Sequence, residues 1–257
     1  MPDRSVLLVG HGTSSVEGTE QFLRLVADFS KLAGGSVSGG FIEKAQPTLT
    51  NAADELLAAG ASRITVVPAV LLPAGHLKDD TRAITNYIRR LNPNADVRMA
   101  RDIGVTSEIV ACLSDRIAAA GGFPDGILVV GRGSTDPAAN SQLYAASRLV
   151  MEGHPQTLVE PAFVSLAPPA IAAGLDRLNR LGATNITVAP YFLFKGVLLD
   201  RIAAQAEAWG AQRGVKVRVS AELAADPLVL KALLLRLEQA EVAAPNPNCD
   251  TCRYRQA

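Results

Sequence analysis

The stretch VLLVGHGTS, residues 6–14, decides how the rest of the sequence is interpreted. Four apolar residues run directly into Gly10, His11 and Gly12. An apolar run that ends at a glycine is typical of a buried strand. His11 would then lie at the carboxyl end of that strand, which is the edge where open parallel α/β sheets bind their ligands. The stretch therefore predicts an α/β fold with a functional histidine at the edge of a sheet.

Strand and helix patterns alternate along the chain after this stretch. Proline at a first helical position predicts a helix over 47–59, and β-branched residues predict a strand over 63–72. The helix that follows is expected to carry Asp79 and Asp80 in its first turn, where carboxylates stabilise a helix. A glycine-rich turn cluster, GGFPDG at 121–126, then separates two units of the chain.

The same pattern starts again after the turn cluster, so the chain contains an internal repeat of about 121 residues. GASRITVVP at 60–68 matches GATNITVAP at 182–190 in six of nine positions, and VGHGT at 9–13 matches VGRGS at 130–134. Each half alternates four strands with four helices, which predicts two similar parallel-sheet lobes flanking a cleft. The expected domains are a first lobe at 1–121, a second lobe at 122–243 and a flexible tail at 244–257.

The two halves act as internal controls for each other. Three groups able to bind a metal ion or a proton occur in the first half, each at or just past a predicted strand end: His11, Glu43 and His76. Their counterparts in the second half are Arg132, Ser165 and Leu198. Two imidazoles and a carboxylate are a common ligand set for divalent transition metals, and histidine exchanges protons near neutral pH. The pattern therefore predicts a catalytic metal site confined to the first half.

Composition narrows the classes of function. The 25 Lys and Arg residues balance the 25 Asp and Glu residues, which argues against a nucleic-acid partner that needs a broad basic face. No apolar run approaches the ~18 residues of a membrane span, and no signal peptide is visible. Three cysteines do not form a disulfide framework. We expect a cytoplasmic enzyme that acts on a small molecule, as a monomer or as a dimer through its tail.

Three motifs together resemble a known family: VGHGT at 9–13, GFIEKAQPTL at 40–49 and VVPAVLLPAGHLKDD at 66–80. They are similar to the sirohydrochlorin chelatases of the CbiX type, class II chelatases of cobalamin and sirohaem synthesis, in the long form with two fused halves. The resemblance implies insertion of a divalent metal into sirohydrochlorin with release of two protons. It further implies that His11 and His76 are metal ligands and proton acceptors, and that Glu43 is a third ligand or a proton relay.

Sirohydrochlorin is a tetrapyrrole with eight carboxylates, so the resemblance also implies cationic substrate ligands. The candidates are the basic residues near strand ends: Lys44, Lys78, Arg82, Arg132 and Lys195. Cobalt is the favoured metal because the two-half form resembles the cobalt-dedicated branch, with iron and nickel as alternatives. A metal or tetrapyrrole carrier without turnover is the non-enzyme alternative. A metal-dependent hydrolase is disfavoured because the sequence displays no further set of groups to bind an electrophile.

The tail contains a separate candidate site, the CxxC motif formed by Cys249 and Cys252. Some long CbiX proteins carry a C-terminal cysteine motif associated with an iron–sulfur cluster, and the resemblance therefore implies that such a cluster could form here. Two thiolates supply half of a four-thiolate site, and Cys112 is expected to be a small apolar core residue. The two cysteines are equally compatible with a thiol pair for metal delivery, a redox switch or an inert flexible tail.

Overall fold

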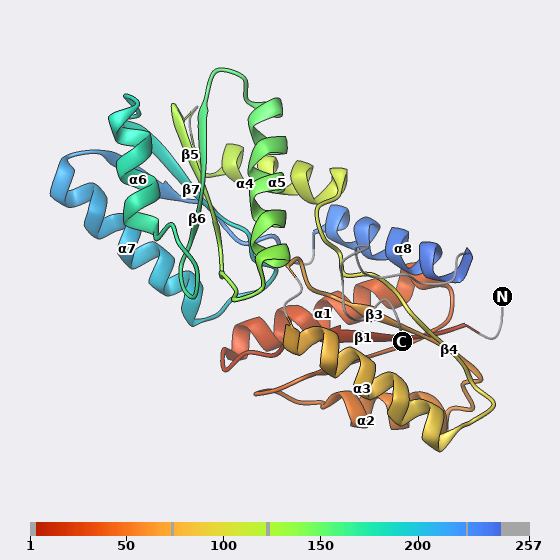
Figure 1. Ribbon diagram of the computed structural model, residues 1–257. Coiled ribbons are helices and arrows are strands. Elements are labelled where there is room, and N and C mark those ends of the chain that lie inside the picture. Colours follow the sequence, from red (N-terminus) through yellow and green to blue (C-terminus); the bar gives the residue numbers. More distant parts are fainter. Residues whose placement is uncertain (1–3, 73–74, 122–123, 225, 243–257) are drawn as a thin grey trace. The chain divides into compact units, whose positions relative to one another are not determined.

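The computed structural model describes residues 4–72, 75–121, 124–224 and 226–242, without the side chains of residues 75–78 (Figure 1). The strands are β1 (Ser5–Gly10), β2 (Ser36–Phe41), β3 (Arg63–Pro68), β4 (Asp96–Met99), β5 (Gly126–Gly131), β6 (Leu158–Phe163), β7 (Asn185–Pro190) and β8 (Lys216–Val219). The helices are α1 (Val16–Ala33), α2 (Leu49–Ala58), α3 (Gly75–Leu91), α4 (Ser107–Ala119), α5 (Pro137–Gly153), α6 (Ile171–Arg180), α7 (Val197–Arg213) and α8 (Pro227–Val242). This alternation confirms the predicted α/β class.

The described strands form two parallel four-stranded sheets with the same topology. The strand order is β2-β1-β3-β4 in the first sheet and β6-β5-β7-β8 in the second. Every pairing is parallel, with Gly10 of β1 opposite Phe41 of β2 and Gly131 of β5 opposite Phe163 of β6. The chain therefore consists of two similar parallel-sheet lobes, as the internal repeat predicts. In each sheet the strand order reverses at the first strand, which is where parallel α/β sheets place their ligands.

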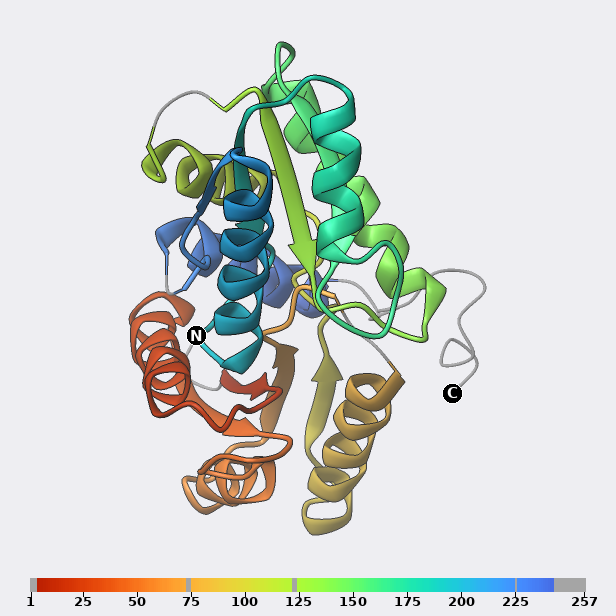
Figure 2. The same ribbon diagram turned by 90° about the vertical axis from the view of Figure 1, so that its left-hand side faces the viewer.

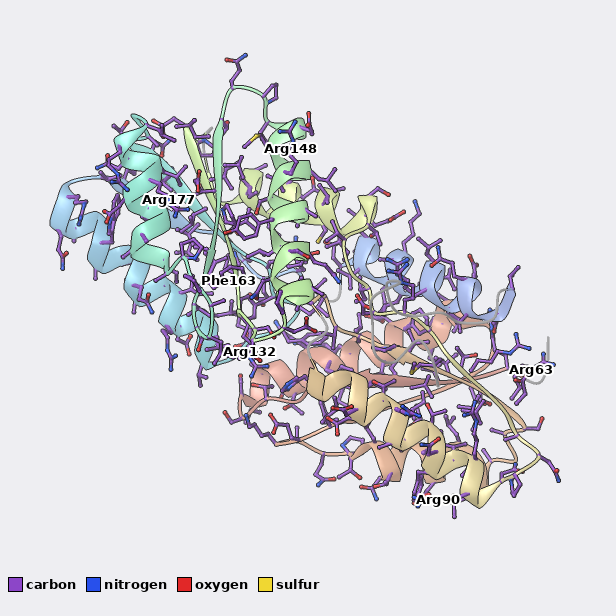
Figure 3. The ribbon with its side chains drawn as sticks, viewed as in Figure 1. Arg63, Arg90, Arg132, Arg148, Phe163 and Arg177 are labelled. Atoms are coloured by element: carbon purple, nitrogen blue, oxygen red, sulfur yellow. The ribbon has the colours of Figure 1, made fainter. Side chains whose placement is uncertain are left out.

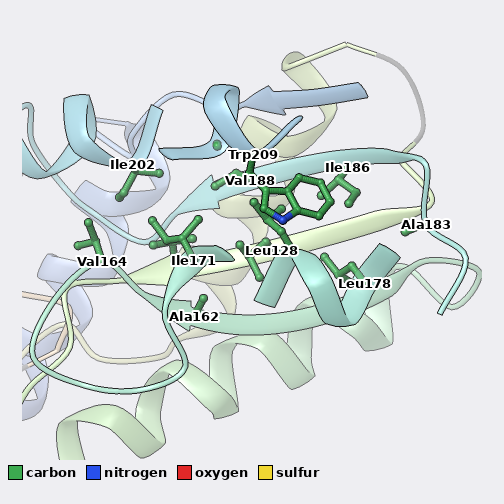
Figure 4. Packing of buried hydrophobic residues seen from close by; sticks show 13 residues of the cluster. Leu128, Ala162, Val164, Ile171, Leu178, Ala183, Ile186, Val188, Ile202 and Trp209 are labelled. Carbon is green, nitrogen blue, oxygen red and sulfur yellow. The ribbon is translucent and has the colours of Figure 1, made fainter. Parts of the chain in front are cut away.

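Helices cover both faces of each sheet (Figures 1 and 2). In the first sheet α2 and α3 lie on one face and α1 and α8 on the other, and in the second α6 and α7 lie opposite α4 and α5. The first strand of each sheet is buried along its whole length, which explains its continuous apolar sequence. In the second lobe Trp209 packs among Leu128, Leu178 and Val188 (Figure 4), and its Nε1 donates a hydrogen bond to Asp176.

The compact units of the structure differ from the expected domains in the last helix of each half. Unit 1 consists of the described residues up to Gly104 and from Val229 onward, and unit 2 of those between Val105 and Leu228. Helix α4, which follows the last strand of the first sheet, thus belongs to unit 2. Helix α8, which follows the last strand of the second sheet, belongs to unit 1. Sequence similarity identifies the repeated segments, whereas tertiary packing decides which segments share a core.

An arginine fixes each exchanged helix to the loop after the last strand of the unit that receives it. The contacts join Arg116 of α4 to the carbonyl oxygens of Glu222 and Leu223, and Arg236 of α8 to those of Asp102 and Ile103, at 2.7–3.1 Å. Arg236 follows Arg116 by 120 positions, and Glu222 follows Asp102 by 120 positions, so the two exchanges are equivalent. The buried face of α4, which includes Ile109 and Leu113, accordingly packs within unit 2.

Helix α2 begins two residues later than the proline pattern predicts. Its N-cap is Thr48, whose hydroxyl accepts a hydrogen bond from the backbone N–H of Asn51 at 3.2 Å. The Asn51 side chain accepts in return from the backbone N–H of Thr48 at 3.3 Å. Pro47 therefore precedes the cap instead of occupying the first helical position. This reciprocal cap satisfies two backbone groups that a helix start otherwise leaves without a partner.

Two buried hydroxyl groups offer a test of how the sheets are stabilised. Thr65 of β3 and Thr187 of β7 are 1% and 0% exposed, and neither Oγ1 has a hydrogen-bond partner within the described residues. We expect Thr65→Val and Thr187→Val each to raise the free energy of unfolding by about 1 kcal/mol, because valine has the same shape without the unsatisfied hydroxyl. Urea denaturation measures this change. A loss of stability in both variants would contradict the prediction and indicate that the hydroxyls are satisfied.

Candidate functional site

The candidate site begins where β1 and β2 end next to each other. The hydrogen-bond ladder between the two strands continues past their ends, from the N–H of Ile42 to the carbonyl of Gly10 at 3.0 Å. The next rung joins the N–H of Glu43 to the carbonyl of His11 at 3.2 Å. This ladder brings His11 and Glu43, which are 32 residues apart in the sequence, to adjacent positions at the carboxyl edge of the first sheet.

The two glycines that flank His11 permit this close approach of the backbones. Gly12 has a φ of +98°, and a Cβ at this position would lie 1.8 Å from the carbonyl oxygen of Glu43. A Cβ on Gly10 would lie 2.8 Å from the ring of Phe22, which is buried under β1. A side chain at either position would push the β1 end away from its neighbours. The glycines therefore allow His11 to lie beside Glu43.

Three polar side chains meet at this edge: His11, Glu43 and Lys44. The His11 Nδ1 lies 3.7 Å from Oε1 of Glu43, and the Lys44 Nζ lies 3.0 Å from the same oxygen. The side chains of His11, Glu43 and Lys44 are 36%, 45% and 58% exposed. The cluster is thus open to solvent, where a metal ion or an anionic substrate can reach it.

The distance between His11 and Glu43 fits a shared metal ion. Imidazole nitrogen and carboxylate oxygen bind divalent metals at about 2.1 Å, so two tetrahedral ligands of one ion lie about 3.4 Å apart. The observed 3.7 Å separation of Nδ1 and Oε1 requires only a small adjustment. These two residues can therefore bind one divalent ion, and both can accept protons when they do not bind it.

The third expected ligand, His76, is the second residue of α3, and its side chain lies outside the described part of the structure. Strand β3, which precedes α3, pairs with β1, so the sheet order leads the chain to the same edge. β3 ends at Pro68 and α3 already begins at Gly75, so Asp79 and Asp80 lie beyond the first turn, contrary to expectation. Among the described side chains, no group of three or more His, Cys, Asp or Glu residues is placed to bind a metal.

The two remaining basic candidates of the first half, Lys78 and Arg82, belong to α3. Arg82 is exposed on this helix. The side chain of Lys78 lies outside the described part of the structure. Only Lys44, of the basic candidates in this half, is thus described in contact with a predicted metal ligand.

The second lobe repeats the backbone of the site with different side chains. Gly133 has a φ of +87°, and a Cβ there would lie 1.9 Å from the carbonyl oxygen of Ser165. A Cβ on Gly12 would meet the carbonyl oxygen of Glu43 in the same way. The N–H of Ser165 donates to the carbonyl of Arg132 at 3.0 Å. Lys44 and its counterpart Leu166 both adopt the left-handed conformation, with φ of +63° and +59°. The duplication therefore preserves the loop geometry and replaces the chemistry.

Arg132 and Lys195 are the basic candidates of the second lobe. Arg132 directly follows β5 and is exposed (Figure 3), and Lys195 is half-buried in the loop between β7 and α7. Because β5 pairs with β7, both residues belong to the carboxyl edge of the second sheet. This edge presents cations where the first sheet presents an imidazole and a carboxylate.

Cys112, the one cysteine within the described residues, does not contribute to the site. Cys112 is fully buried in α4, and this burial raises the pKa of its thiol to about 12. A thiol of this kind is a core residue rather than a metal ligand, as the sequence predicts. Cys249 and Cys252 lie outside the described residues, so the cluster or thiol site in the tail stays a prediction.

Comparisons with known proteins agree on the fold and the family. The model of the CbiX family matches residues 5–120 and again residues 126–240. A sirohydrochlorin cobaltochelatase of Priestia megaterium is 32% identical over 98% of this chain and 85% of its own length. A sirohydrochlorin ferrochelatase of the same organism is 30% identical over 79% of this chain and 78% of its own length.

A solved structure has the same architecture. The sirohydrochlorin chelatase SirB from Bacillus subtilis subspecies spizizenii, in complex with cobalt, matches with a TM-score of 0.80 and 23% identity, over 93% of this chain and 95% of that one. The fold is therefore that of the two-lobed chelatases. The chain belongs to the CbiX family, as its three motifs predict.

Sequence reasoning missed two features of the site. It did not predict the close approach of Gly12 to Glu43, or the left-handed conformation that directs Lys44. The first had a signal, because Gly12 and Gly133 occupy the same position in both halves. The second had none, because lysine and leucine rarely adopt a positive φ and neither residue type indicates it.

Proposed function

We propose that this protein is a sirohydrochlorin cobaltochelatase, which inserts Co²⁺ into sirohydrochlorin and releases two protons in cobalamin biosynthesis. The observation that carries the proposal is the match over nearly the whole chain to a relative that bears this activity in its name. The geometry of His11 and Glu43 supports it, because an imidazole and a carboxylate lie 3.7 Å apart at the sheet edge where parallel α/β sheets commonly bind ligands. The enzyme would be a lyase whose metal ion is a substrate.

In this proposal His11, His76 and Glu43 bind the metal ion and take up the protons. Insertion replaces two pyrrole N–H bonds by bonds to the metal, so two protons must leave the macrocycle. Imidazole and carboxylate groups can accept them as they release the ion. Holding the ion and the proton acceptors on one face of the ring would place the reacting atoms together, which lowers the entropic part of the barrier.

The basic residues near the sheet edges would bind the carboxylates of the tetrapyrrole. The proposed ligands are Lys44, Lys78, Arg82, Arg132 and Lys195. Arginine binds a carboxylate through two parallel hydrogen bonds, whereas lysine acts as a compact charge. Arg132 is the strongest candidate of this set in the second lobe because it is exposed at the position that carries His11 in the first.

Iron is the second candidate metal, because a ferrochelatase relative is 30% identical. The ligand set accepts both ions, and the general affinity order places cobalt above iron. Anaerobic insertion assays with Co²⁺, Fe²⁺ and Ni²⁺ in parallel, each followed by the absorbance change of sirohydrochlorin, test the proposal. Faster turnover with Co²⁺ supports the cobaltochelatase. Preference for Fe²⁺ would assign the protein to sirohaem synthesis, and binding of Co²⁺ without turnover with any ion would indicate a carrier.

Arg132→Ala tests the role of the second lobe in substrate binding. We expect the KM for sirohydrochlorin to rise by about 10-fold, because a charge-assisted contact to a carboxylate contributes on the order of 1.5 kcal/mol. The dissociation constant for Co²⁺ should not change, because Arg132 is not one of the proposed ligands. Arg148→Ala is the matched control, since Arg148 is an exposed arginine of the same unit that pairs with Glu152 on α5. An unchanged KM in Arg132→Ala would contradict the assignment.

A further inference from the structure

Lys44 forms an ion pair with the carboxylate of Glu43, which is one of the proposed ligands of the metal ion. Its Nζ and the Nδ1 of His11 face the same oxygen, Oε1 of Glu43, at 3.0 and 3.7 Å. A divalent ion bound between His11 and Glu43 would therefore take over the oxygen that the ammonium holds. Two cations cannot share this position without strong repulsion, since like charges a few ångströms apart repel even in water.

The position of Lys44 is set by the backbone rather than by its ion pair. Leu166 has nearly the same φ in the second lobe, +59° against +63°, although it carries no charge. Both residues are exposed: Leu166 as a whole residue is 62% exposed, and the side chain of Lys44 is 58% exposed. The loop thus directs the side chain of this residue toward solvent in both halves, and in the first half this places a cation beside Glu43.

We propose that Lys44 is a counter-cation of the metal site, which holds Glu43 until the divalent ion displaces it and then binds a carboxylate of the tetrapyrrole. The inference rests on the proposed chelatase function and deepens it. The ammonium stands on a flexible four-carbon stem, so it can change partner without a change in the backbone. The two substrates then favour each other's binding. The metal frees Lys44 for the tetrapyrrole, and a carboxylate that attracts Lys44 frees Glu43 for the metal.

If Lys44 changes partner in this way, its removal should strengthen Co²⁺ binding and weaken sirohydrochlorin binding. This pair of opposite effects distinguishes the proposal from other roles of a lysine. In Lys44→Leu we expect Co²⁺ to bind about 3- to 10-fold more tightly, because a competing cation is removed from a solvent-exposed carboxylate. In the same variant the KM for sirohydrochlorin should rise about 3- to 10-fold, because a cation that binds the substrate is lost. Leucine suits the test because Leu166 already occupies the same conformation in the second lobe.

The experiment measures Co²⁺ affinity by isothermal titration calorimetry without tetrapyrrole, and the KM for sirohydrochlorin in the anaerobic assay, at one ionic strength. Lys31→Leu is the matched control, because Lys31 is an exposed lysine of unit 1 that pairs with Asp28 on α1. It removes the same charge and should leave both constants within about twofold. In a Glu43→Gln background, Lys44→Leu should no longer tighten Co²⁺ binding, because the two cations then have no carboxylate to compete for.

Each competing role of Lys44 gives a different result. Weaker Co²⁺ binding in Lys44→Leu would mean that Lys44 orients Glu43 for the metal, and unchanged Co²⁺ binding would mean that it acts on the tetrapyrrole alone; either result overturns the inference. A raised Co²⁺ affinity with an unchanged KM would overturn its second half. Failure of the proposed function is a separate observation, since the wild-type protein would then show no metal insertion at all.

Discussion

Replacing His11 by alanine is expected to lower kcat for Co²⁺ insertion by about 10²- to 10⁴-fold. The imidazole lies 3.7 Å from the Glu43 carboxylate at the edge of the first sheet. In the proposed function it both binds the metal ion and accepts a proton from the macrocycle. Losing a positioned proton acceptor alone costs a factor of this size. Calorimetry should also show weaker Co²⁺ binding, because one ligand of the ion is missing. His76→Ala should behave in the same way.

His154→Ala is the control for His11→Ala. The chain contains three histidines, and His154 is the C-cap residue of α5 in unit 2. Its backbone N–H donates to the carbonyl of Met151 at 3.1 Å, a contact that alanine keeps. Activity and Co²⁺ affinity of this variant should match those of the wild type. If His11→Ala inserts Co²⁺ at nearly the wild-type rate, His11 is neither a metal ligand nor a proton acceptor, and the prediction is wrong.

Gly12→Ala should weaken Co²⁺ binding by a different route, through the backbone. The new Cβ would meet the carbonyl oxygen of Glu43 at 1.8 Å, and the φ of +98° is unfavourable for alanine. We expect the free energy of unfolding to fall by about 3 kcal/mol and Co²⁺ affinity to fall at least about 10-fold, because Glu43 is displaced from His11. Chemical denaturation and calorimetry measure the two effects.

Two other glycines separate the causes of this loss. Gly34 has a φ of +70° with nothing within 4 Å of its Cβ position, so Gly34→Ala measures the cost of the conformation alone, about 1 kcal/mol. Gly133→Ala repeats the clash of Gly12→Ala in unit 2, against Ser165. It should cost as much stability but leave Co²⁺ affinity unchanged. Equal losses of Co²⁺ affinity in Gly12→Ala and Gly133→Ala would contradict a metal site confined to the first lobe.

Much of the fold could be predicted from the sequence because its signals are local. Continuous apolar runs identify buried strands, and the matching letters of the two halves identify the duplication, so the two parallel sheets and the CbiX family were both predicted correctly. The placement of His11 and Glu43 at adjacent strand ends follows from the same reasoning. The helix starts were less predictable, since α2 begins at Leu49 after the N-cap Thr48 and not at Pro47.

Long-range packing could not be predicted in this way. The expected boundary at residue 121 follows the repeat, but α4 packs into unit 2 and α8 into unit 1. The contacts that fix them, from Arg116 to Glu222 and from Arg236 to Asp102, join residues more than 100 positions apart. An amphipathic helix shows in its sequence that it has an apolar face, but not which sheet that face will cover. The partner of Lys44 is likewise decided by a conformation that its residue type does not suggest.

The exchange of α4 and α8 has a consequence for the order in which the protein can be made. A ribosome delivers the first sheet before residue 100, but the helix that completes the core of unit 1 emerges only after the strands of both sheets. Unit 1, which carries His11 and Glu43, therefore receives its last helix only after unit 2, which has all its parts by residue 228. A nascent chain that has emerged only as far as residue 228 would thus have unit 2 complete, while unit 1, which carries the candidate ligands, would still lack α8.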